Sequence, residues 1–137
     1  MKTRSLIVGI SVVIVLVVSV VVVTTIKNYV NTSFATEVSI KFHYRDNEID
    51  VVVTDENDIR VLKECLNGAS FRDNPSCGFS LDVSIQFSDG DKSIILCPAC
   101  DECSSARVGD TDWYINIKGR EALEAVLRKY GMTFPCV

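Results

Sequence analysis

Six cysteines are the residues of this 137-residue sequence best suited to chemistry, and four of them are clustered. Cys97, Cys100 and Cys103 lie in one run, Cys-Pro-Ala-Cys-Asp-Glu-Cys, which Cys77 precedes. Cys65 and Cys136 stand apart from this group. Thiols can pair as disulfides, bind soft metal ions as thiolates, or exchange electrons. The cysteines of this sequence are therefore candidates for each of these three chemistries.

Disulfide bonds are the first interpretation, because the number of cysteines is even and a small domain gains stability from covalent links. All six are candidates: Cys65, Cys77, Cys97, Cys100, Cys103 and Cys136. A hairpin centred on Asp89-Gly90 predicts that Ile85 faces Ile94. The same register brings Cys77 within reach of Cys100 or Cys103. Six cysteines allow 15 connectivities, and the sequence does not choose one of them.

Metal binding is the alternative interpretation. Three thiolates at Cys97, Cys100 and Cys103 could supply most of a tetrahedral zinc site, with Cys136, Cys77 or a carboxylate as the fourth ligand. This is the only cofactor that the sequence suggests, and the disulfide interpretation requires none. An iron–sulfur run is disfavoured, because Arg107 stands where a fourth cysteine is expected.

Thiol redox chemistry is the third interpretation. Cys97-Pro-Ala-Cys100 after an apolar strand resembles the active-site motif of thioredoxin-type enzymes, whose first thiol lies at the start of a long helix. Gly109 follows too soon for such a helix. The single histidine, His43, lies on the polar face of a predicted strand, and no catalytic constellation surrounds it. The sequence therefore argues against an enzyme and assigns no catalytic residues.

The elements that must position the cysteines follow from hydrophobic periodicity. Alternating side chains predict strands over residues 38–44, 49–53, 79–87, 92–97 and 113–117, and a short one over 106–108. Helical spacing predicts helices ending near Gly68 and Gly131. We therefore expect an α+β fold after an N-terminal transmembrane helix, with about five antiparallel strands in the order ββαββ(β)βα and two helices covering one face.

The N-terminal segment predicts a membrane anchor. Residues 6–26 carry no charge and include ten valines, whereas residues 1–5 form a basic head. A helix of this length would span a bilayer, and the positive-inside rule would place the N-terminus in the cytoplasm. The expected organisation is a head over 1–5, an anchor over 6–26, a stalk over 27–36 and an extracytoplasmic domain over 37–137. A cleaved signal peptide is the competing interpretation.

Charge limits the class of partner. Residues 27–137 contain 12 basic and 18 acidic residues, which argues against nucleic acid as a ligand. The expected contacts are the membrane, through residues 6–26, and an envelope protein of unspecified identity.

Several short motifs follow one another between Cys77 and Gly131: Cys-Gly, Phe-Ser-Asp-Gly, the cysteine run, Gly-Asp, Trp-Tyr-Ile and Lys-Tyr-Gly. As a set they resemble small, functionally uncharacterised exported domains of Gram-positive bacteria that are anchored to the membrane. This resemblance implies a place in the bacterial envelope and no activity. The sequence thus predicts a single-span, disulfide-stabilised, non-catalytic binding or structural module, with a zinc or thiol-redox domain as the alternative.

Overall fold

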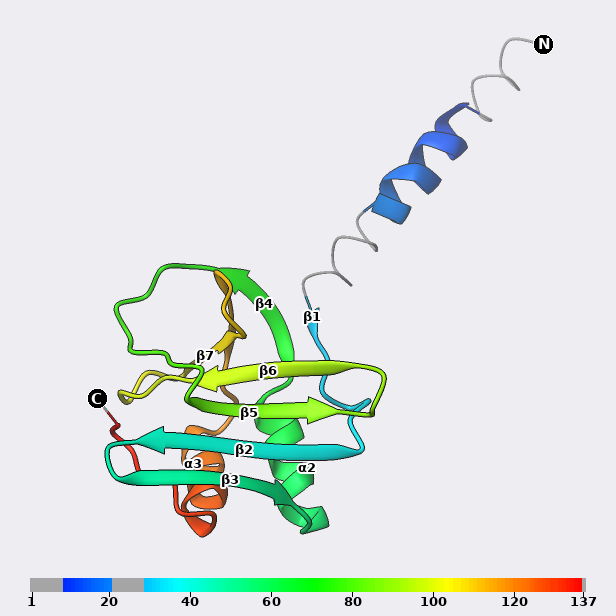
Figure 1. The fold of residues 1–137 in the computed structure, drawn as a ribbon. Coiled ribbons are helices and arrows are strands. Elements are labelled where there is room, and N and C mark those ends of the chain that lie inside the picture. Colours follow the sequence, from blue (N-terminus) through cyan, green and yellow to red (C-terminus); the bar gives the residue numbers. More distant parts are fainter. Residues whose placement is uncertain (1–8, 21–28, 137) are drawn as a thin grey trace, which may run out of the picture.

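The computed structural model describes residues 9–20 and 29–136. Residues 9–20 form a helix, and residues 29–136 form one sheet with two further helices (Figure 1). The strands are β1 Tyr29–Val30, β2 Glu37–Tyr44, β3 Asn47–Val53, β4 Gly68–Arg72, β5 Val83–Ser88, β6 Ser93–Pro98, β7 Ser105–Val108 and β8 Trp113–Asn116. The helices that follow β3 and β8 are α2 Glu56–Cys65 and α3 Arg120–Lys129.

All strand pairs of the sheet are antiparallel, and the eight strands lie in the order β1-β4-β8-β7-β6-β5-β2-β3. The prediction of about five strands is therefore wrong. β1 and β4 were missed because they are short and show no alternation of apolar side chains. Their strand structure comes from pairing with each other and with β8.

The core lies between one face of the sheet and the two helices. Alternating residues of β2 and β5, among them Ile40, Phe42 and Ile85, are almost fully buried in it. Leu62 of α2 and Leu127 of α3 pack into the same cluster. The opposite face of β2, β3 and β5 carries mainly polar and charged side chains, as one-sided covering of an antiparallel sheet requires.

The predicted transmembrane anchor over residues 6–26 is contradicted. Within the described residues, no helix is long and apolar enough to cross a membrane. The same finding contradicts the predicted single-pass location with an extracytoplasmic domain. Residues 1–8 and 21–28, which include the basic head, lie outside the described residues.

Residues 29–36, the described part of the expected stalk over 27–36, pack against the rest of the fold. They contain β1, and the side chains of Val30, Thr32 and Ala35 are buried. The hydroxyl of Thr32 also donates to the carbonyl of Lys63, 3.0 Å away. This segment is therefore part of the domain.

The predicted register of the β5–β6 hairpin is wrong by two residues. Ile85 pairs with Leu96, and Ser88 pairs with Ser93, so a four-residue loop closes the hairpin. The Asp89 carboxylate fixes this loop by accepting from the amides of Asp91, at 3.0 Å, and Lys92, at 2.7 Å. A shift of two residues keeps the same side chains on the inner face.

The strand predicted over 79–87 begins only at Val83. Residues 79–82 instead turn away, where the Ser80 hydroxyl accepts from the amide of Asp82 at 3.1 Å. The apolar alternation of Phe79 and Leu81 was misleading, because a local side-chain bond to the backbone can replace a ladder bond at a strand end.

Candidate functional site

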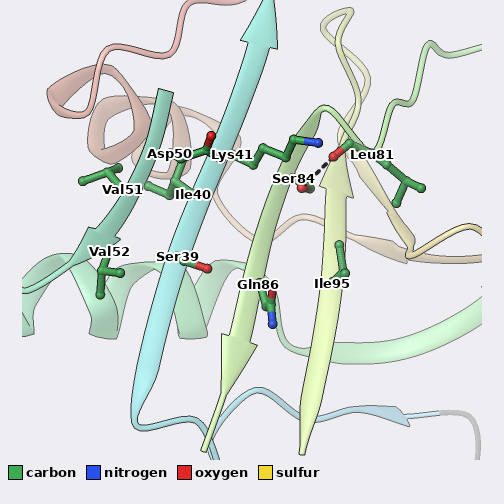
Figure 2. Close-up of a pocket in the computed structure, with 10 residues that line it drawn as sticks. All are labelled: Ser39, Ile40, Lys41, Asp50, Val51, Val52, Leu81, Ser84, Gln86 and Ile95. Carbon is green, nitrogen blue, oxygen red and sulfur yellow. Dashed lines mark hydrogen bonds between the residues drawn. The ribbon is translucent and has the colours of Figure 1, made fainter. Parts of the chain in front are cut away.

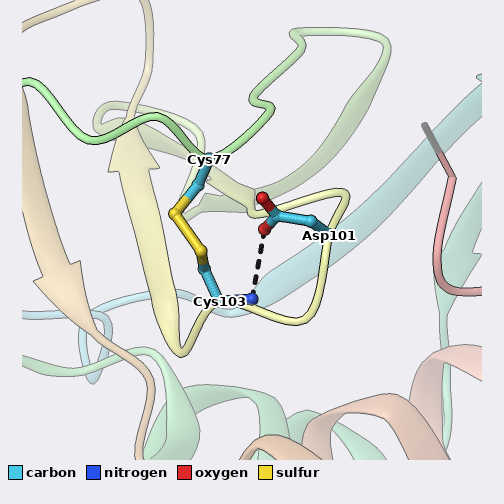
Figure 3. Close-up of side chains that lie close together, drawn as sticks. All are labelled: Cys77, Asp101 and Cys103. Carbon is cyan, nitrogen blue, oxygen red and sulfur yellow. Dashed lines mark hydrogen bonds between the residues drawn. A yellow bond between two sulfur atoms is a disulfide. The ribbon is translucent and has the colours of Figure 1, made fainter.

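The cysteine run begins at Cys97 in β6 and continues in a loop, residues 99–104, that is fastened to the segment before β5. Cys77 and Cys103 form a disulfide bond with a Cα–Cα distance of 6.3 Å (Figure 3). The carboxylate of Asp101 turns back to accept from the amide of Cys103 at 3.1 Å. A disulfide is therefore present in this cluster, and the other four cysteines are free thiols.

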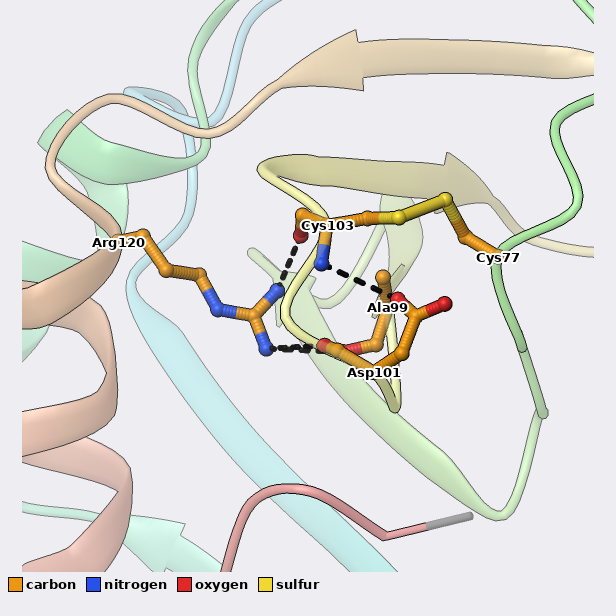
Figure 4. The surroundings of a disulfide bond; sticks show 5 residues. All are labelled: Cys77, Ala99, Asp101, Cys103 and Arg120. Atoms are coloured by element: carbon orange, nitrogen blue, oxygen red, sulfur yellow. Dashed lines mark hydrogen bonds between the residues drawn. A yellow bond between two sulfur atoms is a disulfide. The ribbon is translucent and has the colours of Figure 1, made fainter.

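Arg120, the first residue of α3, holds the same loop from the other side (Figure 4). Its guanidinium donates to three carbonyl oxygens, those of Cys103 at 2.6 Å, Ala99 at 2.9 Å and Asp101 at 3.0 Å. Its Nε donates to Glu124 at 2.7 Å. These bonds satisfy backbone carbonyls of a loop that forms no strand ladder there, so Arg120 gives the loop its shape.

Sequence reasoning missed Arg120, although a signal was present. A cation at the first position of a helix is unfavourable for the helix dipole, which prefers acidic residues there. In this structure the loop after β6 supplies the partners of the Arg120 guanidinium and offsets that cost.

Cys97 and Cys100 do not join the disulfide. Cys97 pairs with Arg107 across β6 and β7, and its side chain points to the face opposite that of Leu96. Burial raises the pKa of the Cys97 thiol to about 11, against the opposing effect of the nearby Arg107 guanidinium. A thiol of this kind is protonated at neutral pH and is a poor nucleophile.

Cys100 lies beside Cys136 instead. The amide of Cys136 donates to the carbonyl of Cys100 at 2.8 Å, and both side chains are buried. Cys65, on α2, is buried elsewhere, with its sulfur 3.7 Å from the carbonyl oxygen of Gly119. The structure thus divides the six cysteines into one disulfide, one adjacent pair and two separate thiols.

The four predicted zinc ligands, Cys97, Cys100, Cys103 and Cys136, are not gathered at one point. Among the residues that the structure describes, the only group of three with converging ligand atoms is Cys77, Asp101 and Cys103. Two sulfurs of this group are bonded to each other and so offer no thiolate. Zinc binding by the cysteine run stays a prediction.

The uncovered face of the sheet forms the second candidate region. A groove of about 450 Å³ crosses β2, β3, β5 and β6, with Ser39, Val52, Gln86 and Ile95 among its lining residues (Figure 2). His43 lies on this face, with its Nε2 2.7 Å from Oδ2 of Asp50. That contact explains the single histidine as part of a surface pair.

Strand β3 is the edge of the sheet next to this groove. A two-residue turn joins β2 to β3, so Tyr44 and Asn47 form the first hydrogen-bonded pair and every second pair after it is also hydrogen-bonded. The backbone groups that face β2 are therefore those of Asn47, Ile49, Val51 and Val53. The amides and carbonyls of Glu48, Asp50 and Val52 consequently point away from β2, towards the open edge of the sheet, where no further described strand lies. These three side chains are exposed.

Comparison of the chain with protein-family models, with curated proteins and with solved structures found no match. The resemblance to exported domains of Gram-positive bacteria therefore stays a prediction, and the geometry alone must support a function.

Proposed function

We propose that this protein is a disulfide-stabilised, non-catalytic binding module that captures an extended, cationic polypeptide segment along the edge of β3. The observation that carries this proposal is the unpaired outer side of β3, where the backbone groups of Glu48, Asp50 and Val52 face outward. An extended segment can add to such an edge as a further strand, with main-chain hydrogen bonds giving affinity.

The side chains of the edge support a cationic partner. Glu48 and Asp50 are both exposed on the outer face. A third carboxylate near the groove is that of Asp82, whose Oδ1 lies 2.8 Å from Nζ of Lys41. The acidic groups outnumber the cations along this part of the surface. Basic side chains on alternate positions of an added strand would lie opposite Glu48 and Asp50, where opposite charges stabilise cross-strand pairs.

A second copy of this chain is a poorer partner for the same edge. Antiparallel pairing of one whole β3 with another would place Asp50 opposite Asp50. Like charges directly opposite each other destabilise a strand pair. The edge is therefore protected against self-association and open to a strand of opposite charge.

The covalent frame keeps this surface in place. The Cys77–Cys103 disulfide anchors the segment before β5, whose residue Leu81 borders the groove. His43 of β2 and Asp82 of the same segment are also linked, because the amide of His43 donates to the carbonyl of Asp82 at 2.8 Å. A binding surface that is held in this way loses little conformational entropy on binding.

The proposal is tested by titrating the full-length protein with a short peptide of alternating lysine and valine, capped at both ends. We expect amide chemical-shift changes concentrated at Glu48, Asp50 and Val52, and weaker binding as salt is added. Two further peptides serve as controls. One replaces lysine by glutamate, and the other carries N-methyl groups on the amides that would face β3.

Two variants sharpen the result. Val52→Pro removes an outward-facing donor without removing a bond to β2, so it should weaken binding while the fold persists. Glu102→Gln removes an exposed charge of the loop after β6, outside β3 and its groove, and should leave binding unchanged. Equal binding of the N-methylated or glutamate peptide, or shifts confined to groove residues such as Gln86, would overturn the proposal. Dimerisation of the protein alone through β3 would overturn it as well.

A further inference from the structure

The C-terminal tail returns to the cysteine loop and places two free thiols side by side. Cys136 follows α3 by a short turn in which Met132 is fully buried, and Phe134 lies under the Arg120 guanidinium at 5.0 Å from its ring centroid. The tail ends with the amide of Cys136 donating to the carbonyl of Cys100 at 2.8 Å. Both side chains are buried, with exposed fractions of 4% and 5%.

We propose that Cys100 and Cys136 are the site of a second disulfide bond, which fastens the C-terminal tail to the loop after β6. Two residues joined by a backbone hydrogen bond between neighbouring strands have their Cα atoms about 5 Å apart. A similar separation of Cys100 and Cys136 falls within the range that a disulfide spans. The structure therefore shows the reduced form of a pair whose backbone is already arranged for the bond.

The two thiols also interact with each other. Burial raises the pKa of the Cys136 thiol to about 12, and its hydrogen bond with the Cys100 thiol acts in the same direction. Little Cys136 thiolate is therefore present at neutral pH while the tail is in place. We expect the bond to form during folding, or when the tail opens, rather than by direct attack of the buried thiol on an oxidant.

The required oxidant is a small disulfide such as oxidised glutathione. The thiolate of one cysteine attacks a sulfur of the oxidant, forms a mixed disulfide and releases one glutathione thiolate. The thiolate of the other cysteine then attacks the protein sulfur of that mixed disulfide and releases the second. The two thiol protons pass to the two glutathione thiolates, so the cysteine pair is oxidised and one glutathione disulfide is reduced to two thiols.

The proposed bond also determines which cysteines stay unpaired. Loop 99–104 would carry both bridges, to Cys77 on one side and to Cys136 on the other, while Cys65 and Cys97 would stay free. The sulfur of Cys65 donates to the carbonyl of Gly119 at 3.7 Å, and the sulfur of Cys97 donates to the carbonyl of Gly109 at 3.9 Å. The expected oxidised protein therefore has two bridges and two buried thiols.

The test is oxidative refolding of the reduced full-length chain in a glutathione redox buffer, followed by thiol counting in denaturant and intact mass. We expect two free thiols and a mass loss of about 2 Da for each bridge. Cys136→Ser should leave three free thiols, whereas the control Cys65→Ser should leave one. Cys100→Ser, which should also leave three, serves if Cys136→Ser does not fold.

Peptide mapping identifies the bond. Trypsin releases residues 130–137, and a protease that cleaves before Asp101 separates Cys100 from Cys103; Cys97→Ser then distinguishes the two remaining cysteines. We expect residues 130–137 to be linked to the peptide that contains Cys100. The doubly bridged protein should melt roughly 10 °C higher than Cys136→Ser.

Three results would overturn this inference. They are four free thiols after refolding, a link from Cys136 to Cys65 or Cys97, and a bond between Cys97 and Cys100. None of them bears on peptide binding at β3, so failure of this inference and failure of the proposed function are distinguishable.

Discussion

The guanidinium of Arg120 donates a hydrogen bond to the carbonyl oxygen of Cys103 at 2.6 Å, and so joins the start of α3 to one end of the disulfide. The side chain is only 12% exposed, and it serves two further carbonyls of the same loop. One cation therefore replaces the ladder bonds that loop 99–104 lacks.

We expect Arg120→Leu to lower the free energy of unfolding by about 2–4 kcal/mol, because it leaves several buried carbonyls and Glu124 without their donor. Arg120→Lys should recover only part of this loss, since an ammonium cannot match the planar array of donors. Urea unfolding of each variant measures the effect. Arg60→Ala is the control, because its exposed pair with Glu64 should contribute less than about 1 kcal/mol. A loss for Arg120→Leu no larger than that of the control would contradict this account.

Stability at low pH should depend on Asp58. Its buried carboxylate accepts from Lys129 at 2.6 Å and from the Tyr130 hydroxyl at 3.0 Å, and the Lys129 bond lowers its pKa from the ordinary value of 3.8. A lowered pKa gives stability that is present above pH 3.8 and is lost as pH falls through the folded-state value. Asp58→Asn should thus be least destabilising at the acid end, as unfolding measured from pH 2 to pH 7 would show. Equal destabilisation across this range would argue against the contact.

The same contact predicts a loss at high pH. Burial, followed by the Asp58 carboxylate, raises the pKa of Tyr130 to about 12. A raised pKa gives stability that is present below the unfolded value near 10 and is lost as pH rises towards 12. Tyr130→Phe should remove this part of the alkaline decline, as unfolding measured from pH 8 to pH 12 would show. A decline that is unchanged in the variant would count against the assignment.

Cys97 should be unreactive in the folded protein. Its thiol is fully buried and its pKa is raised to about 11 by burial, so alkylation with iodoacetamide at pH 8 should proceed only on unfolding. Ser93→Cys, which places a thiol at an exposed position of the same strand, is the positive control. Mass spectrometry of labelled peptides reports both sites. Rapid native labelling of Cys97 would instead favour a redox function.

The backbone direction of β3 can be tested with proline. Val51 faces β2 with its amide, whereas the amide of Val52 faces outward. We expect Val51→Pro to lower the free energy of unfolding by about 3 kcal/mol more than Val51→Ala does. The corresponding difference between Val52→Pro and Val52→Ala should be much smaller. Chemical unfolding measures all four variants. Equal proline costs at the two positions would show that the register is different.

Part of this protein could be read from local patterns. Alternation placed β2, β3, β6 and β8 close to their observed positions, because each has one apolar face that only a half-buried strand can satisfy. Helical spacing likewise located α2 and α3. Edge strand β1 and strand β4 carry no such pattern, and their structure depends on partners far along the chain.

The sequence by itself determined the number of cysteines, their clustering after a strand, and an acidic surface. Only the tertiary structure decided which thiols meet: Cys103 with Cys77, and Cys100 beside Cys136. The same holds for Arg120 on its loop and for Lys129 on Asp58. Spacing along the chain fixes which face of an element a side chain occupies. Which distant element packs against that face is decided by how the whole sheet and its two helices bury their apolar sides together.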